Sequence, residues 1–204
     1  MSKEPAFDLI VIAASAGGVQ ALQHVLSRLP ADFPVPVCIV QHRSLRTPDL
    51  LPQVLGRSTR LKVKRSAPGE HMEAGTVYLA PVDAHLIVNP DLTLALKDGT
   101  RIRHVLSSAN PLFTTAAHAT GKGTIGVVLT GNDSDATDGV QAIKHEGGLV
   151  IAQDRSTAQN FGMPGSAIQT GAVDYVLPLD LIGPALVDLV HGRKVIPPLR
   201  ATAD

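Results

Sequence analysis

A short apolar stretch near the N-terminus, ending in a serine and two glycines, constrains the fold of this chain more than any other feature. Asp8–Gly18 reads DLIVIAASAGG, and apolar residues then recur with helical periodicity from Val19 to Leu29. An unbroken apolar run of this length is typical of a parallel strand buried on both faces, followed here by a tight turn into a helix. The unit predicts an open α/β fold, in which chemistry gathers at the carboxyl ends of the strands.

The serine that ends this run, Ser15, has more than one role open to it. Its hydroxyl could cap the helix by accepting a backbone N–H, which is the more common role of a serine at this place. It could also be a nucleophile. Gly17 and Gly18 suggest a third role, a phosphate-binding turn, although the pattern matches neither G-x-G-x-x-G nor the P-loop. The choice depends on whether a base and an acid arrive at the ends of other strands.

Strands and helices alternate along most of the chain, which predicts one doubly wound α/β domain with a mainly parallel sheet and helices on both faces. Further strands are expected at 37–40, 61–65, 124–130, 149–152 and 174–177, and helices at 49–55, 110–120, 139–145, 163–169 and 179–190. Segments 85–88 and 92–96 predict an inserted antiparallel hairpin. Asn110 is the expected cap of its helix, with Pro111 at the first helical position. The domain is expected to span 1–192, followed by a tail at 193–204.

The composition excludes several classes of function. Lys and Arg number 18 against 18 Asp and Glu, so the formal net charge is zero, and aromatic residues make up only 3%. We therefore expect no nucleic-acid partner and no membrane insertion. The single cysteine, Cys38, lies in an apolar run and is expected to be a buried residue of a cytoplasmic protein. The eight histidines show no metal-binding spacing, so neither a metal nor a cofactor is expected.

Polar groups of complementary kinds follow three of the predicted strands. Ser15 follows the first strand, His42 follows the second, and the loop after Leu129 offers Asp133, Asp135 and Asp138. The carboxyl ends of parallel strands share one edge of the sheet, so these groups could meet. A serine nucleophile needs a neutral imidazole to take its proton, and the imidazole needs a carboxylate to orient it. Spacing alone leaves a purely structural role open for each of them.

Several stretches together resemble the CheB family of protein-glutamate methylesterases. They are Ile12–Leu22 (IAASAGGVQAL), Val40–His42 (VQH), Ala67–Pro81 (APGEHMEAGTVYLAP) with His85, Gly126–Gly131 (GVVLTG) and Phe161–Pro164 (FGMP), in the family's order. The resemblance implies a doubly wound catalytic domain that hydrolyses γ-glutamyl methyl esters on helical segments of receptor-type proteins in chemotaxis-like signalling. Some members of the family also deamidate glutamine, so the resemblance implies that this reaction is possible here as well.

The resemblance also implies roles for individual residues. It places the nucleophile at Ser15, the base at His42 and the acid at Asp135, with backbone N–H groups near Ala16 and Asn132 for the oxyanion. A receiver domain usually precedes this domain in the family, and here only a few residues precede the first strand. We therefore expect one of three situations. The enzyme is constitutively active, it is controlled by a separate receiver or signalling partner, or it acts in a pathway other than chemotaxis.

The chain departs from the family pattern around the acid. The motif L-T-G-M-G-x-D-G is LTGNDSDA at 129–136, so Asn132 replaces a methionine while Asp133 and Ala136 replace glycines. Ala136 would be strained if its position requires a positive φ. Asp133 becomes a rival of Asp135 for the role of the acid.

Two further departures lie outside that loop. Ala16 replaces the threonine that follows the family's serine, which removes a hydroxyl but keeps the backbone N–H. Segment 106–113 lacks the arginine and aspartate of the motif R-P-S-x-D-x-L-F, so receptor recognition could differ from that of the family. The alternative function is a non-catalytic or altered-specificity scaffold that binds a helical partner protein.

Overall fold

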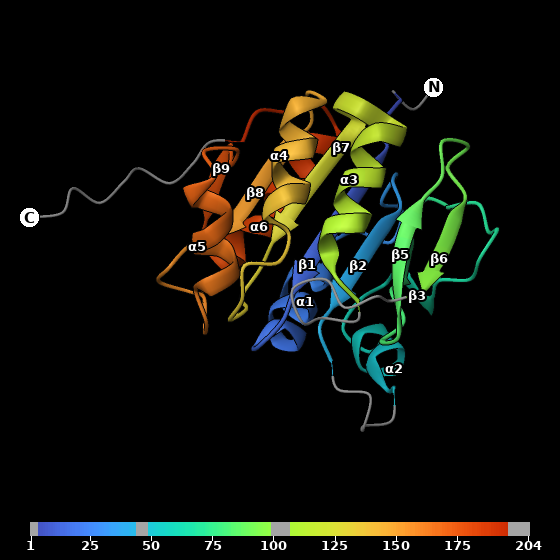
Figure 1. The fold of residues 1–204 in the computed structure, drawn as a ribbon, viewed down its shortest axis with the longest axis horizontal. Coiled ribbons are helices and arrows are strands. Elements are labelled where there is room, and N and C mark those ends of the chain that lie inside the picture. The colour runs from blue at the N-terminus through green and yellow to red at the C-terminus, as the bar shows by residue number, and fades with distance from the viewer. Residues whose placement is uncertain (1–3, 44–48, 99–106, 196–204) are drawn as a thin grey trace, which may run out of the picture.

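Seven strands form one sheet through the middle of the molecule (Figure 1). This computed structural model describes residues 4–43, 49–98 and 107–195. The strands are β1 (Leu9–Ala14), β2 (Val37–Gln41), β3 (Lys62–Arg65), β4 (Thr76–Leu79), β7 (Thr124–Val128), β8 (Leu149–Gln153) and β9 (Tyr175–Leu177). Their order is β3-β4-β2-β1-β7-β8-β9, and every neighbouring pair is parallel. The chain leaves central β1 toward β2 on one side and later returns to β7 on the other, so the crevice typical of doubly wound folds lies at the carboxyl end of β1.

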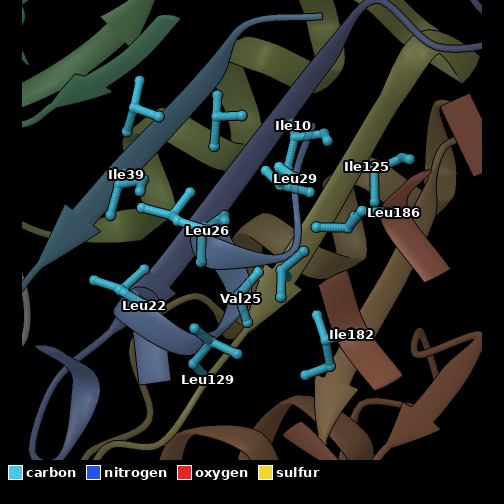
Figure 2. Close-up of a cluster of buried hydrophobic side chains, with 14 of the residues drawn as sticks. Ile10, Leu22, Val25, Leu26, Leu29, Ile39, Ile125, Leu129, Ile182 and Leu186 are labelled. Atoms are coloured by element: carbon cyan, nitrogen blue, oxygen red, sulfur yellow. The ribbon is translucent and has the colours of Figure 1, made fainter. Parts of the chain in front are cut away.

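Helices cover both faces of the sheet, as predicted (Figure 1). One face carries α1 (Gly18–Ser27), α2 (Leu51–Gly56) and α6 (Leu179–Val190), and the other carries α3 (Ala109–Thr120), α4 (Thr137–His145) and α5 (Gly162–Gln169). Side chains of β1 alternate between these layers. Ile10, labelled in Figure 2, joins the α1 and α6 layer together with Ile12, whereas Leu9 and Val11 join the opposite layer. All six residues of β1 are buried, which explains its unbroken apolar sequence.

The predicted hairpin is a separate sheet. β5 (Ala84–Val88) and β6 (Leu94–Asp98) pair antiparallel, and β5 lies against α3. The Val88 N–H donates to Oγ1 of Thr115 on α3 at 3.0 Å. The hairpin thus extends the layer that covers β1 and β2 without joining the main sheet. Cys38 on β2 is fully buried, as expected. No helix in the described part of the chain is long and apolar enough to cross a membrane.

One predicted cap was wrong. The N-cap of α3 is Ser108, whose Oγ accepts the N–H of Asn110 at 3.2 Å. The side chain of Asn110 instead accepts the N–H of Gly139 at 2.9 Å, which joins α3 to α4. Pro111 is accordingly the third residue of the helix rather than the first. Serine and asparagine are nearly equivalent caps, so local sequence could not choose between them.

Candidate active site

Ser15 begins the turn between β1 and α1. The N-cap of α1 is Gly17, in the left-handed region with a φ of 77°, and no side chain caps the helix. The explanation of Ser15 as a helix cap is therefore wrong. The Gly18 N–H instead bonds to the backbone oxygen of Ser15 at 2.8 Å, and the Ser15 hydroxyl makes no hydrogen bond with any described residue.

Close packing explains the second glycine of the turn. A Cβ at Gly18 would lie 2.2 Å from Oε1 of Gln41 and 2.8 Å from Cβ of Ala14. Gln41, at the end of β2, donates through Nε2 to the backbone oxygen of Ser15 at 2.9 Å. A side chain at position 18 would push Gln41 away from the serine turn. The glycine is thus accounted for without a phosphate.

We expect Gly18→Ala to lower the free energy of unfolding by about 1–3 kcal/mol, because the added methyl group overpacks a rigid contact. Urea denaturation followed by circular dichroism measures the change. Gly56→Ala is the matched control, since a Cβ at Gly56 meets only Cβ of Val63 at 4.0 Å. Equal stabilities for the two variants would contradict the packing argument.

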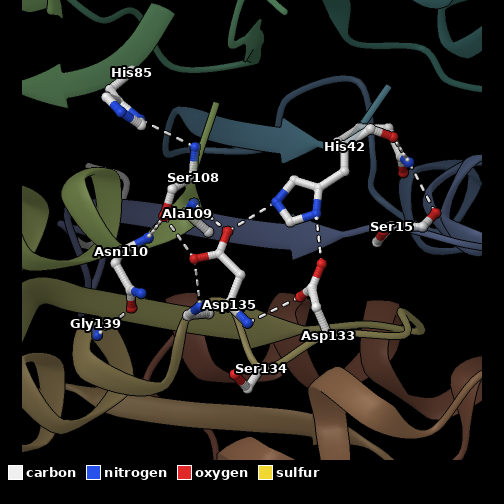
Figure 3. A network of polar contacts seen from close by, with 12 residues as sticks. Ser15, His42, His85, Ser108, Ala109, Asn110, Asp133, Ser134, Asp135 and Gly139 are labelled. Atoms are coloured by element: carbon white, nitrogen blue, oxygen red, sulfur yellow. Dashed lines mark hydrogen bonds and ion pairs between the residues drawn. The ribbon is translucent and has the colours of Figure 1, made fainter. Parts of the chain in front are cut away.

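His42 lies between two carboxylates. Its backbone N–H donates to the oxygen of Ala14 at 3.0 Å, which holds it beside the serine turn. The ring contacts Asp135 through Nε2, 2.8 Å from Oδ2, and Asp133 through Nδ1, 3.2 Å from Oδ2. In Figure 3, Ser15 and Asp135 lie on either side of the ring. No hydrogen bond joins His42 to the Ser15 hydroxyl in the described part of the chain.

Asp135 is held from several directions. Its side chain is only 2% exposed. Oδ1 accepts Ser108 Oγ–H at 2.6 Å and the Ala136 N–H at 2.9 Å, and Oδ2 accepts the Ala109 N–H at 2.6 Å. The carboxylate therefore sits at the N-terminus of α3, where the helix dipole favours negative charge. Burial works to raise the pKa of Asp135, but His42 and these donors outweigh it and lower the pKa below its ordinary value.

Asp133 is held more loosely. Its side chain is 38% exposed, and among the described residues its partners are His42 and the Asp135 N–H, which it accepts at 2.9 Å. Burial works to raise the pKa of Asp133, but the His42 and backbone hydrogen bonds outweigh it and lower that pKa. For His42, burial favours a lower pKa, whereas the two aspartates raise it to about 9. The two carboxylates therefore favour the protonated form of the ring.

The two backbone groups expected to bind an oxyanion belong to neighbouring turns. Oγ1 of Thr130 donates to the backbone oxygen of Ala16 at 2.9 Å, which links the turn after β1 to the end of β7. A Cβ at Gly131 would lie 2.9 Å from Cβ of Ser15, so the absence of a side chain lets the turns approach. The N–H groups of Ala16 and Asn132 donate no hydrogen bond to any described residue.

Sequence reasoning missed the residues that hold Asp135. Ser108 and the Ala109 N–H were not singled out, although a serine before a helix is a cap signal. Ala136 has a φ of 77°, so its position does require the left-handed conformation expected from the motif. Its N–H binds Asp135 in that conformation. No group of three or more metal-binding side chains occurs among residues 4–43, 49–98 and 107–195.

Replacing Ser108 by alanine removes both a helix cap and one donor to a buried carboxylate. We expect the free energy of unfolding to fall by about 1–3 kcal/mol, which chemical denaturation would measure. Ser27→Ala is the control, because Ser27 is exposed at the end of α1 and its hydroxyl donates to the backbone oxygen of His24, one turn earlier in the same helix. A Ser108→Ala variant as stable as Ser27→Ala would contradict the assignment of this cap.

Comparison with known proteins agrees with this architecture. The family model described as CheB methylesterase matches residues 10–186. A relative from Leptospira interrogans is 38% identical over 183 residues, which cover 90% of this chain and 95% of that protein. The protein-glutamate methylesterase FrzG of Myxococcus xanthus is 39% identical over 186 residues, covering 91% of this chain and 56% of FrzG. The chain thus spans nearly all of one relative and about half of the other.

A solved structure shows the same fold. The crystal structure of the Thermotoga maritima CheB methylesterase catalytic domain superposes with a TM-score of 0.87 at 36% identity, covering 90% of this chain and 99% of that domain. The fold of this chain is therefore that of a known enzyme catalytic domain. On the extent of the family match and these identities, the chain belongs to the CheB methylesterase family.

Proposed function

We propose that this chain hydrolyses γ-glutamyl methyl esters on a methylated receptor-type protein, with Ser15 as nucleophile, His42 as base and Asp135 as the acid that orients the base. The observation that carries the proposal is the 2.8 Å contact between His42 Nε2 and the buried Asp135, on a histidine held beside the Ser15 turn. Buried and multiply bonded, Asp135 can hold the ring in one orientation and stabilise positive charge on it.

The reaction follows from these positions. Nδ1 of a neutral His42 takes the proton of Ser15 Oγ, and the oxygen attacks the ester carbonyl. The tetrahedral intermediate collapses, the bond to the methoxy group breaks, and His42 returns the proton so that methanol leaves. Water activated by His42 then attacks the acyl-serine, which releases the glutamate carboxyl group and restores the Ser15 hydroxyl. The net change is ester plus water to acid plus methanol.

The oxyanion of each tetrahedral intermediate would be stabilised by the backbone N–H groups of Ala16 and Asn132. Both are without a partner among the described residues, and both lie at the edge where the nucleophile emerges. Fixed donors aimed at developing charge are worth several kcal/mol in such sites. Because the donors belong to the backbone, the replacement of a methionine by Asn132 leaves this contribution in place.

Glutamine deamidation is a second reaction of the same site. A relative from Anaeromyxobacter dehalogenans, 40% identical over 184 residues, is named protein-glutamate methylesterase/protein-glutamine glutaminase. An amide would give the same acyl-serine, with ammonia leaving in place of methanol. The product in both cases is a glutamate side chain.

A fluorophosphonate probe tests the proposal against the alternative of a non-catalytic scaffold. We expect modification of one serine per chain, mapped by mass spectrometry to Ser15, together with release of methanol from a methylated receptor fragment. A protein that binds the helical fragment but neither reacts with the probe nor releases methanol would be a scaffold. Labelling at another serine would overturn the assignment of the nucleophile.

A further inference from the structure

Asp133 faces the ring nitrogen of His42 that the proposed mechanism requires for Ser15. Asp135 occupies Nε2, so only Nδ1 remains to accept a proton, and Oδ2 of Asp133 lies 3.2 Å from it. An ionised carboxylate can only accept hydrogen bonds. With Nε2 on Asp135, the ion pair with Asp133 forms only when Nδ1 also carries a proton, and an imidazolium has no lone pair with which to act as a base.

The two carboxylates differ in how easily they can leave the ring. Asp135 is 2% exposed and bonded to Ser108, Ala109 and Ala136, so its position is fixed. Asp133 is 38% exposed, and its contact with the ring is longer by comparison with the 2.8 Å contact of Asp135. Its carboxylate can be solvated once it moves away from His42. Asp133 is thus the exchangeable partner and Asp135 the permanent one.

We propose that Asp133 inhibits the esterase. It is a positioning residue that competes with Ser15 for Nδ1 of His42 and holds the ring in its protonated, inactive form. This inference rests on the proposed function. Asp133 replaces a glycine of the family motif, and the inference gives it a role other than that of the orienting acid. Hydrolysis then requires Asp133 to release Nδ1, so that the ring loses a proton and the Ser15 hydroxyl takes its place.

The charges around His42 support this role. Among the described residues, the charged groups on the ring are Asp133 and Asp135, both from the loop between β7 and α4, while the turn after β1 contributes the neutral Ser15. Burial of His42 opposes protonation, yet the two carboxylates raise its pKa to about 9. The protonated ring is therefore favoured at pH 7. Removal of the Asp133 charge would restore a larger neutral fraction.

The test compares Asp133→Ala and Asp133→Asn with the parent chain. Asp133→Ala removes the carboxylate that contacts Nδ1, and Asp133→Asn keeps a side-chain oxygen that can accept the Asp135 N–H. We expect the His42 pKa, followed by NMR of the imidazole, to fall by at least about one unit in both variants. The rate of ester hydrolysis at pH 7 should rise by about tenfold or more in Asp133→Ala, and its pH profile should shift to lower pH.

Asp32→Asn is the matched control, since it removes one negative charge from an exposed position in the connection between α1 and β2. It should leave the His42 pKa and the pH profile unchanged. An unchanged His42 pKa in both Asp133 variants overturns the inference, as does a loss of hydrolysis in Asp133→Ala, which would make Asp133 the orienting acid. Failure of the proposed function can be told apart from failure of this inference. If the serine mechanism is wrong, the Ser15→Ala variant hydrolyses the ester as fast as the parent chain does.

Discussion

Ser15→Ala is expected to reduce the hydrolysis of a γ-glutamyl methyl ester by about 10⁴- to 10⁶-fold, the loss typical of an enzyme deprived of its serine nucleophile. The fold should remain intact. The Ser15 hydroxyl bonds to no described residue, and the contacts that shape the turn use its backbone oxygen, which alanine retains. The free energy of unfolding should therefore change by less than about 0.5 kcal/mol.

Methanol release from a methylated receptor fragment measures the rate, and denaturation of the same preparation measures stability. Ser27→Ala serves as the control, because Ser27 is exposed on α1 away from the turn. A Ser15→Ala variant that retains the parent rate would exclude the acyl-serine mechanism. A variant that loses both rate and stability would show instead that the hydroxyl is a structural group.

The main sheet was predictable because its strands carry an unmistakable pattern. β1 and β7 are buried on both faces, so each is a continuous apolar run, and glycine or a polar residue marks its end. The hairpin was also predictable from alternation around a turn. Helix starts were harder, since several residues near 108–110 can act as caps, and only tertiary contacts select Ser108.

The site was predictable as a set of strand ends but not as a network. Topology brings the ends of β1, β2 and β7 to one edge, which is why Ser15, His42 and the aspartate loop could be expected together. Two features could not be read from the sequence. Ser108 joins Asp135 from a distant helix start, and Asp133 and Asp135 contact opposite nitrogens of one ring. Both depend on side-chain directions within loops, which periodicity does not describe.

Asp135→Ala is expected to damage both catalysis and stability, in contrast to Asp133→Ala. Without Asp135 the His42 ring loses its orienting partner, and hydrolysis should fall by about 10⁴-fold. The Ala109 and Ala136 N–H groups and the Ser108 hydroxyl would lose a shared acceptor in a buried place. The free energy of unfolding should therefore fall by about 3–5 kcal/mol at neutral pH. Ester hydrolysis and urea denaturation of the two variants, side by side, measure these changes.

The pH dependence of that stability loss identifies its cause. The pKa of Asp135 is lowered in the folded state, so its stabilising contribution is present above the ordinary carboxyl pKa and is lost as the pH falls through the folded value. The pKa of His42 is raised to about 9, so the contribution of its charge is complete below its ordinary pKa and is lost as the pH rises through about 9. The difference in unfolding free energy between the parent and Asp135→Ala should thus be largest between these limits and shrink toward acid and alkaline pH. A difference that stays constant from pH 3 to pH 10 would mean that lost packing, and not the carboxylate, accounts for the effect.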